Sequence, residues 1–244
     1  MHTTANFAVT APTADIARRV GDEAEAQRAK LARAWLGKEL PKAPQPVPVR
    51  VVIAAGGGGG ATTFTFGEAD GKRTPGVTAA RMELRGPTLD SILKAALPHE
   101  VMHVVLATHF GRPLPRWADE GLAVLAESAD EQRNHDIRAR EMLNVGRAIR
   151  LSTLFRMTEY PRDSFVTFAQ GYSVCRFLLT RAESMPVDGR GPVHQRMLLA
   201  FVEAGMANNT AAGWDAACRT FGFDSVDALE AAWIDSLRKV QPAR

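Results

Sequence analysis

Cysteine is scarce in this chain of 244 residues, which contains only Cys175 and Cys218. Neither belongs to a C-x-x-C pair, so the sequence offers no cysteine-bound metal site and no dithiol redox motif. Both cysteines fall in stretches with helical periodicity. Buried free thiols and a single disulfide are both compatible with the sequence.

Long apolar runs and a strong excess of one charge are also missing. No segment approaches the roughly 18 consecutive apolar residues typical of a membrane span, and 45% hydrophobic with 23% charged residues is usual for a globular protein. We therefore expect a soluble protein. The net charge is +3 and the basic residues are scattered, so the sequence does not indicate a nucleic-acid partner.

The N-terminal segment MHTTANFAVTAP lacks the positive region and apolar core of a secretory signal. A secreted protein whose signal had been removed would begin in the same way, so the compartment stays open.

The first part of the chain combines one helical pattern with several strand patterns. A short apolar run, 7–9, precedes a stretch with apolar residues at helical intervals, 13–36. Three segments rich in β-branched residues or alternating in polarity follow, and we expect strands at 47–55, 62–66 and 77–84. These elements predict a small α/β lobe.

Almost everything after Leu89 has helical periodicity. The expected helices cover 89–110, 116–128, 133–148, 163–184, 191–206, 209–221 and 225–240. Pro98 cannot donate a backbone hydrogen bond, so we expect a kink or a helix restart just before His99. The predicted class is α+β, with a small mixed-sheet lobe (residues 1–110) followed by an all-helical lobe (residues 111–244).

A run of five glycines, Gly56–Gly60, has two interpretations. Freed backbone N–H groups can cradle phosphate, but the run is followed by ATTF rather than by Lys and Ser or Thr. A flexible hairpin connection between two strands is the simpler interpretation.

The segment His99-Glu100-Val-Met-His103 has the residue types and the spacing of a metal site. Residues four apart on a helix differ by about 40° of rotation and roughly 6 Å of rise, so both imidazoles project from one face and can hold one metal ion. Glu100 stands beside them, where its carboxylate can take a proton from a water at the metal. The remaining faces of the helix are apolar, and a buried Glu100 is costly without a partner such as a metal.

His109 is a possible third ligand, six residues after His103. Metzincins carry a histidine at this distance, after a glycine that turns the chain, but Leu106 stands at the glycine position here. If the helix continues, His109 lies roughly 9 Å further along the axis and about 120° around it, away from the metal. We expect His109 to mark the helix end before Gly111.

The segment PRWADEGLA, with Glu120, resembles the W-x-x-E-G motif of the gluzincin zinc metallopeptidases, including the peptidase MA-like family. The segments FAQGYSVCRFLL and WDAACRTFGFDSVDALEAAWIDSLR resemble the helices that follow in those proteins. The resemblance implies a zincin-like fold with the active-site helix between the two lobes, and Zn2+ held by His99, His103 and Glu120 with Glu100 as general base. Asp119 either supports the site or is a solvated carboxylate at the start of a helix.

Two positions depart from the family pattern. The tyrosine that stabilises the oxyanion in gluzincin aminopeptidases is replaced by Phe168, which has no hydroxyl. Tyr172, one helical turn further on, could substitute or could pack in the core, and Tyr160 is the only other tyrosine. The aminopeptidase motif G-x-M-E-N is reduced to Met82-Glu83, and an alternating strand residue facing water is the simpler explanation of Glu83.

The expected function is hydrolysis of peptide bonds by a zinc-dependent enzyme that acts on a peptide or protein substrate. We expect the strand of ARMEL, 80–84, to offer its edge to an extended peptide, which favours endopeptidase-like cleavage. The alternative is a non-catalytic zinc-binding protein that keeps the fold as a binding or scaffolding module, and Phe168 motivates it. A metal-free helical interaction domain is a third possibility.

Overall fold

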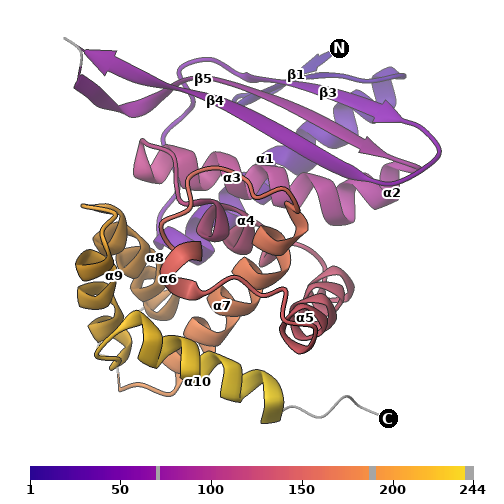
Figure 1. Ribbon diagram of the computed structural model, residues 1–244. Coiled ribbons are helices and arrows are strands. Elements are labelled where there is room, and N and C mark those ends of the chain that lie inside the picture. The colour runs from indigo at the N-terminus through magenta and orange to yellow at the C-terminus, as the bar shows by residue number, and fades with distance from the viewer. Residues whose placement is uncertain (70–71, 187–190, 240–244) are drawn as a thin grey trace. The chain divides into compact units, whose positions relative to one another are not determined.

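The computed structural model describes residues 1–69, 72–186 and 191–239 (Figure 1). The chain divides into two compact units. The first contains residues 1–113 and 126–131, and the second contains residues 114–125 and 132–244. No helix among the described residues has both the length and the apolar character that a membrane crossing requires.

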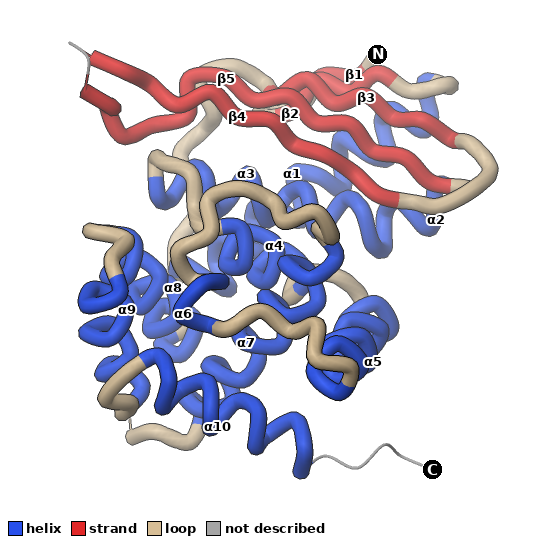
Figure 2. The backbone as a smooth tube through the Cα atoms, viewed as in Figure 1, coloured by secondary structure: helices blue, strands red, loops and turns tan. Residues whose placement is uncertain are grey.

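The first unit contains a mixed sheet, as expected, and the sheet has five strands where the sequence patterns indicated three or four (Figure 2). Its strands are β1 (His2–Thr3), β2 (Phe7–Thr10), β3 (Val47–Ile53), β4 (Gly59–Ala69) and β5 (Lys72–Gly86), in the spatial order β1-β2-β3-β5-β4. The three central strands β2, β3 and β5 are parallel to one another, and the two outer strands are antiparallel to their neighbours.

This strand order corrects two expectations. The glycine run does connect β3 to β4, but not as a hairpin, because β5 lies between these strands and pairs with both. The ARMEL segment belongs to β5 and is therefore an inner strand, whereas β4 is the edge. Alternation of polarity identifies a strand but does not specify its neighbours, so the sequence could not settle the order.

Helices α1 (Ala14–Leu36) and α3 (Leu97–Phe110) lie on the same face of this sheet (Figure 1). Thr13 caps α1 by accepting a hydrogen bond from the Ile16 backbone N–H at 3.2 Å, and Gly37 ends the helix in the left-handed conformation. Apolar side chains of α1 and of the strands face each other in the core between them. They include Val20, Leu31, Trp35, Val49, Met82 and Leu84, all buried.

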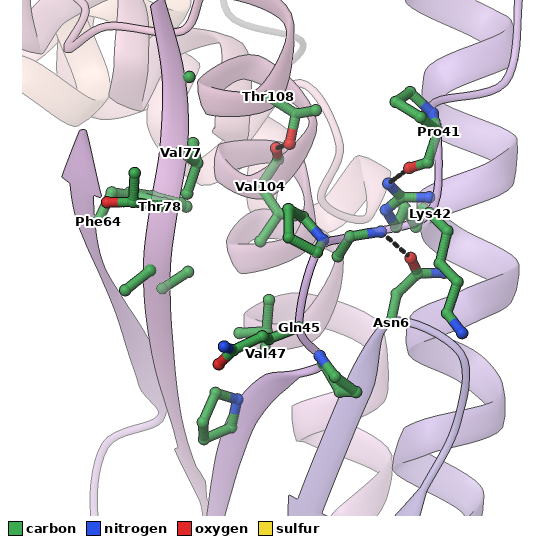
Figure 3. Close-up of a pocket in the computed structure, with 18 residues that line it drawn as sticks. Asn6, Pro41, Lys42, Gln45, Val47, Phe64, Val77, Thr78, Val104 and Thr108 are labelled. Carbon is green, nitrogen blue, oxygen red and sulfur yellow. Dashed lines mark hydrogen bonds between the residues drawn. The ribbon is translucent and has the colours of Figure 1, made fainter. Parts of the chain in front are cut away.

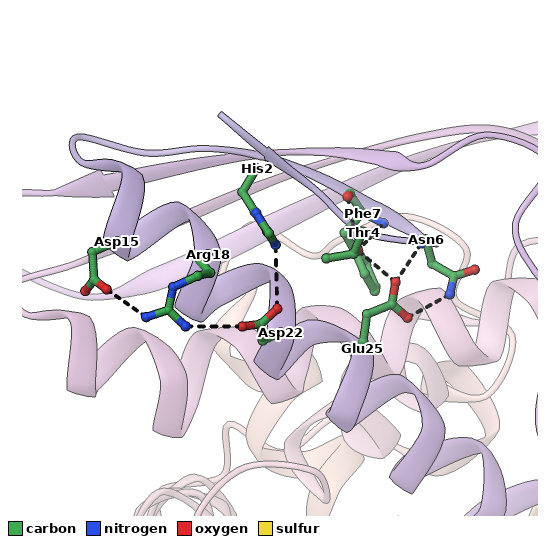
Figure 4. A network of polar contacts seen from close by, with 8 residues as sticks. All are labelled: His2, Thr4, Asn6, Phe7, Asp15, Arg18, Asp22 and Glu25. Carbon is green, nitrogen blue, oxygen red and sulfur yellow. Dashed lines mark hydrogen bonds and ion pairs between the residues drawn. The ribbon is translucent and has the colours of Figure 1, made fainter.

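A polar network fastens the N-terminal strands to α1 (Figure 4). The Glu25 carboxylate on α1 accepts hydrogen bonds from the Thr4 hydroxyl at 2.7 Å and from the backbone and side-chain nitrogens of Asn6 at 2.6 and 2.7 Å. The side-chain oxygen of Asn6 accepts from the Ala43 backbone N–H at 2.8 Å. Glu25 therefore organises both the β1–β2 turn and, through Asn6, the segment that leads into β3.

The expected interruption at Pro98 is confirmed. A short helix α2 (Leu89–Ser91) passes into one π-helical turn (Ile92–Ala96), and α3 then begins at Leu97 with Pro98 in its first turn. The hydrogen bonding changes register there: the Leu97 backbone N–H bonds the Ile92 carbonyl five residues back, and Pro98, which has no N–H, stands where the π turn gives way to α3. The π turn thus lies between α2, which follows β5, and α3, the helix that carries the two histidines.

The second unit is helical in its described part. It contains α4 (Arg116–Val124), α6 (Leu151–Leu154), α7 (Phe165–Glu183), α8 (Val193–Met206), α9 (Ala211–Cys218), a 3-10 turn (Arg219–Phe221) and α10 (Val226–Lys239). Helix α5 (Ala129–Asn144) begins in the first unit and continues in the second. The core of the second unit is an aromatic cluster of Trp117, Phe155, Phe201, Trp214 and Phe221.

Helices α4 and α7 cross at two glycines. A Cβ on Gly171 would lie 2.2 Å from the Trp117 carbonyl oxygen, and a Cβ on Gly121 would lie 2.4 Å from the Gly171 carbonyl carbon. The two backbones are therefore in direct contact, and this contact requires residues without a side chain. Glu120 and Tyr172 each stand next to one of these glycines in the sequence.

Both cysteines are free and buried, which settles the question that the sequence left open. Burial raises the pKa of the Cys175 thiol far above its ordinary value, and burial together with Asp215 raises the pKa of Cys218 to about 12. Both thiols are therefore protonated at neutral pH.

Candidate metal centre

Helix α3 brings His99, Glu100 and His103 together as the four-residue spacing predicts. Their potential ligand atoms all lie within 4.8 Å of one another, and the two imidazole rings meet edge to face with centroids 4.8 Å apart. The three side chains are buried, with relative exposures of 7%, 2% and 7%. A group of this kind could hold a metal ion, and a carboxylate buried beside two imidazoles is otherwise costly.

The helix continues without a break past Leu106 and ends at Phe110, followed by Gly111 in the left-handed conformation. His109 lies in the last turn and is exposed, as expected for a helix-end residue. Residues 97–111, all of them described, therefore lack the sharp turn that the metzincin arrangement needs soon after the second histidine.

A carboxylate that the sequence analysis did not identify holds the first histidine. The Nδ1 atom of His99 lies 2.6 Å from Oε1 of Glu127, and both side chains are about nine-tenths buried. Because an ionised carboxylate can only accept, this bond favours the proton on Nδ1, and in the neutral imidazole the lone pair is then on Nε2, the nitrogen through which a metal would bind. Carboxylate–histidine pairs of this kind fix the tautomer and ring orientation of metal ligands.

The edge strand β4 holds Glu100 from the other side. The Thr62 hydroxyl donates a hydrogen bond to Oε2 of Glu100 at 2.7 Å. A Cβ on Gly60 would lie 2.5 Å from Cγ of Glu100. The last residue of the glycine run therefore lets β4 pass directly over the carboxylate, and Thr62, two residues on, orients it.

Glu83 is on the opposite face of the sheet. Its neighbours Met82 and Leu84 on β5 are buried, while the Glu83 side chain is 46% exposed and lies 3.7 Å from the Arg50 guanidinium. The interpretation of Glu83 as a water-facing strand residue is confirmed.

Glu120 belongs to the second unit, on α4, and is 2% exposed. Its carboxylate accepts a short hydrogen bond from the Tyr160 hydroxyl. The Arg116 guanidinium, one turn earlier on α4, stacks 4.5 Å from the centroid of the Tyr160 ring and lies 3.6 Å from Asp119. Burial and the Glu120 carboxylate raise the pKa of Tyr160, so its phenol is protonated at neutral pH.

Tyr172 and Phe168 lie on α7, also in the second unit. Tyr172 is 1% exposed, and its hydroxyl lies 3.5 Å from Oε1 of Gln132 and 3.4 Å from Nη1 of Arg176. Phe168 is half-buried and packs against Phe165, with ring centroids 6.4 Å apart.

The sequence analysis missed Glu127, Thr62 and Gly60. The only available signals were an acidic residue at the end of the expected helix 116–128 and a glycine run that passes into a strand. Neither signal indicates a contact with α3, because contacts between residues 28 or 38 positions apart are set by packing. A comparison of the chain with known protein families, with curated proteins and with solved structures found no match.

Proposed function

We propose that this protein is a zinc-dependent peptidase that cuts within extended peptide segments. The observation that carries the proposal is the buried His99–Glu100–His103 group, in which Glu127 orients a ligand and Thr62 orients the general base. A binding site for a structural metal would not need the oriented carboxylate beside the two imidazoles.

The donor set fits zinc, which takes imidazole nitrogen and carboxylate oxygen in tetrahedral sites. We assign His99, His103 and Glu120 as the ligands. The assignment of Glu120 is supported by its place in the W-x-x-E-G segment and by its burial. Zinc, when bound, would supply a Lewis acid that acidifies water and polarises the scissile carbonyl.

Glu100 then acts as general base and general acid. Its carboxylate takes the proton of the attacking water and delivers it to the leaving amine. The Thr62 hydroxyl occupies Oε2, which leaves Oε1 for this proton transfer. Burial of the carboxylate keeps competing water away from it.

The contacts favour Tyr160 over Tyr172 as the donor to the developing oxyanion. Tyr160 is 44% exposed, and its hydroxyl donates a hydrogen bond to the proposed ligand Glu120. Tyr172 is enclosed, and its hydroxyl contacts Gln132 and Arg176. Tyr160 would then take the role for which Phe168 has no hydroxyl.

The edge position of β4 supports an extended peptide as the substrate. An edge strand has unpaired backbone groups that can hydrogen-bond a peptide along its length. On β4, Gly60 and Thr62 face Glu100, so a peptide added to this strand would run beside the proposed base. Such binding does not select a chain end, which is typical of endopeptidases.

The test compares zinc-loaded wild type with Glu100→Gln on a diverse peptide pool, scored by mass spectrometry. We expect the variant to keep stoichiometric zinc and its cuts to fall by roughly 10²- to 10⁴-fold, because only the proton transfer is removed. Glu83→Gln, on the opposite face of the sheet, is the matched control and should cut like wild type. Cuts by Glu100→Gln at the wild-type rate would refute the proposed role.

The presence of Phe168 supports one alternative, a non-catalytic zinc-binding protein that uses the same fold as a binding module. Stoichiometric zinc together with no Glu100-dependent cut in the pool would establish that alternative. Absence of zinc from protein purified in its presence would exclude both functions.

A further inference from the structure

The first unit contains a cavity of about 390 Å³ that is separate from the His99–Glu100–His103 group (Figure 3). Its walls are Arg28 of α1, the proline-rich segment 41–48, Phe64 of β4, residues 76–80 of β5, and Val104 and Thr108 of α3. In Figure 3 the strand residues Phe64, Val77 and Thr78 lie across the cavity from Asn6, Pro41 and Lys42. The volume is within the range of small-molecule sites, about 300–1,000 Å³.

Most polar side chains of the wall are already satisfied. Asn6 bonds Ala43 and Glu25 through its two side-chain polar atoms. The Thr108 hydroxyl donates to the Val104 carbonyl at 2.7 Å, and the Thr78 hydroxyl donates to the Thr65 carbonyl at 3.1 Å. Because these side chains already have hydrogen-bond partners within the protein, none of them indicates a ligand.

Arg28 is different. It is only 6% exposed, and its one hydrogen bond to the part of the chain that the structure describes runs from Nη2 to the Pro41 carbonyl at 2.6 Å. Its Nε is buried with no hydrogen-bond partner among the described residues. The two carboxylates whose charge acts on Arg28 are bonded elsewhere: Glu25 accepts from Thr4 and Asn6, and Glu39 pairs with Arg33. A buried guanidinium stays charged, and such a charge is stable only with a compensating anion.

The described residues of the cavity wall include two cations, Arg28 and Lys42, and no carboxylate. The rest of the wall is largely apolar, with four prolines, Val47, Phe64, Val77 and Val104. The cavity can therefore accept a ligand that has one negatively charged end and an apolar body.

We propose that this cavity binds a small organic anion, a monocarboxylate with an apolar hydrocarbon body, whose carboxylate pairs with Arg28. Lys42, which is exposed, adds a second positive charge at the wall. The site does not depend on the metal centre or on peptidase activity. The carboxylate could come from a free fatty acid or from the C-terminus of a short apolar peptide, and the chemistry of recognition is the same.

The experiment measures binding to the full-length protein by isothermal titration calorimetry and NMR shift changes. The probes are decanoate, its uncharged analogue decanol, and the peptide acetyl-Leu-Leu with a free or an amidated C-terminus. We expect one of the carboxylates to bind at least tenfold more tightly than its uncharged analogue, and the one that binds identifies the source. No binding of either carboxylate, or equal binding of charged and uncharged probes, overturns the proposal.

Two variants locate the site. Arg28→Met removes the charge at similar length and should weaken binding of the carboxylate by about tenfold or more, as loss of a charge-assisted hydrogen bond implies. Ala80→Leu, opposite Phe64 on β5, should fill the cavity and block binding while Arg28 is retained. Arg50→Met is the matched control outside the wall. Unchanged affinity in Ala80→Leu overturns the proposal even if Arg28→Met does not fold.

Discussion

The orientation of His99 depends on one carboxylate from a distant part of the chain. Glu127 fixes which ring nitrogen carries the proton, and it does so through a bond that is nearly excluded from water. Thr62 performs a similar task for Glu100. At the scale of residues, the candidate centre is therefore a set of side chains held in place before a metal binds.

Glu127→Gln should weaken zinc binding by about 10- to 100-fold, because the amide is a much weaker acceptor for the His99 N–H. Competition with a chromophoric chelator measures the affinity, and Glu83→Gln serves as control. Equal affinity of Glu127→Gln and wild type would show that this carboxylate does not support the ligand.

Thr62→Val should lower kcat by about tenfold or more and leave zinc affinity unchanged, because the isosteric side chain cannot donate to Glu100. Thr62→Ser retains the hydroxyl and should restore most of the rate. Steady-state kinetics on a peptide from the pool checks both. If Thr62→Val and Thr62→Ser are equally active, the hydroxyl does not position the base.

At the scale of elements, the crossing of α4 and α7 determines where Glu120 stands. The helices meet backbone to backbone at Gly121 and Gly171, immediately beside Glu120 and Tyr172 in the sequence. This close approach explains why a glycine follows the glutamate in one segment and precedes the tyrosine in the other.

Gly171→Ala should destabilise the fold by about 3 kcal/mol, the upper end of the usual overpacking cost, because the added methyl would lie 2.2 Å from a backbone oxygen that cannot move aside easily. Urea unfolding followed by circular dichroism measures the difference. A Cβ on Gly213, in α9, would lie no closer than 3.3 Å to another atom, the side-chain oxygen of Thr210, so Gly213→Ala should have little effect. A similar small effect at both positions would contradict the close crossing.

At the scale of the whole molecule, the two buried thiols make stability depend on alkaline pH. The unfolded chain loses both protons near pH 9, whereas the folded chain retains them to about pH 12 or above. The contribution of the thiols to the free energy of unfolding is therefore fully present below pH 9. It falls as pH rises above that value, by at most about 1.4 kcal/mol per pH unit for each thiol.

Urea unfolding between pH 8 and 11 should show this decline, and it should be reduced in Cys175→Ala/Cys218→Ala. Both thiols should also resist alkylation in the folded protein at pH 8. Rapid alkylation, or the same decline in the double variant, would show that the thiols are not the buried titrating groups.

The sequence alone determined the features that depend on local geometry. The four-residue spacing of His99 and His103 places both rings on one helix face, the apolar repeat over 13–36 predicts α1, and Pro98 marks a restart, because each depends on a helical repeat or on one residue's backbone. The mixed sheet followed by helices is confirmed for the same reason. Glu120 as third ligand stays a prediction.

Only the tertiary structure decided which distant segments meet. It placed β5 between β3 and β4, Glu127 against His99, Thr62 and Gly60 against Glu100, and Arg28 beside an apolar cavity. These contacts join residues far apart in the chain, and their partners are chosen by packing and burial rather than by any periodic pattern. The sequence thus specified the helix face that carries the candidate metal ligands, while the groups that orient them came from the fold.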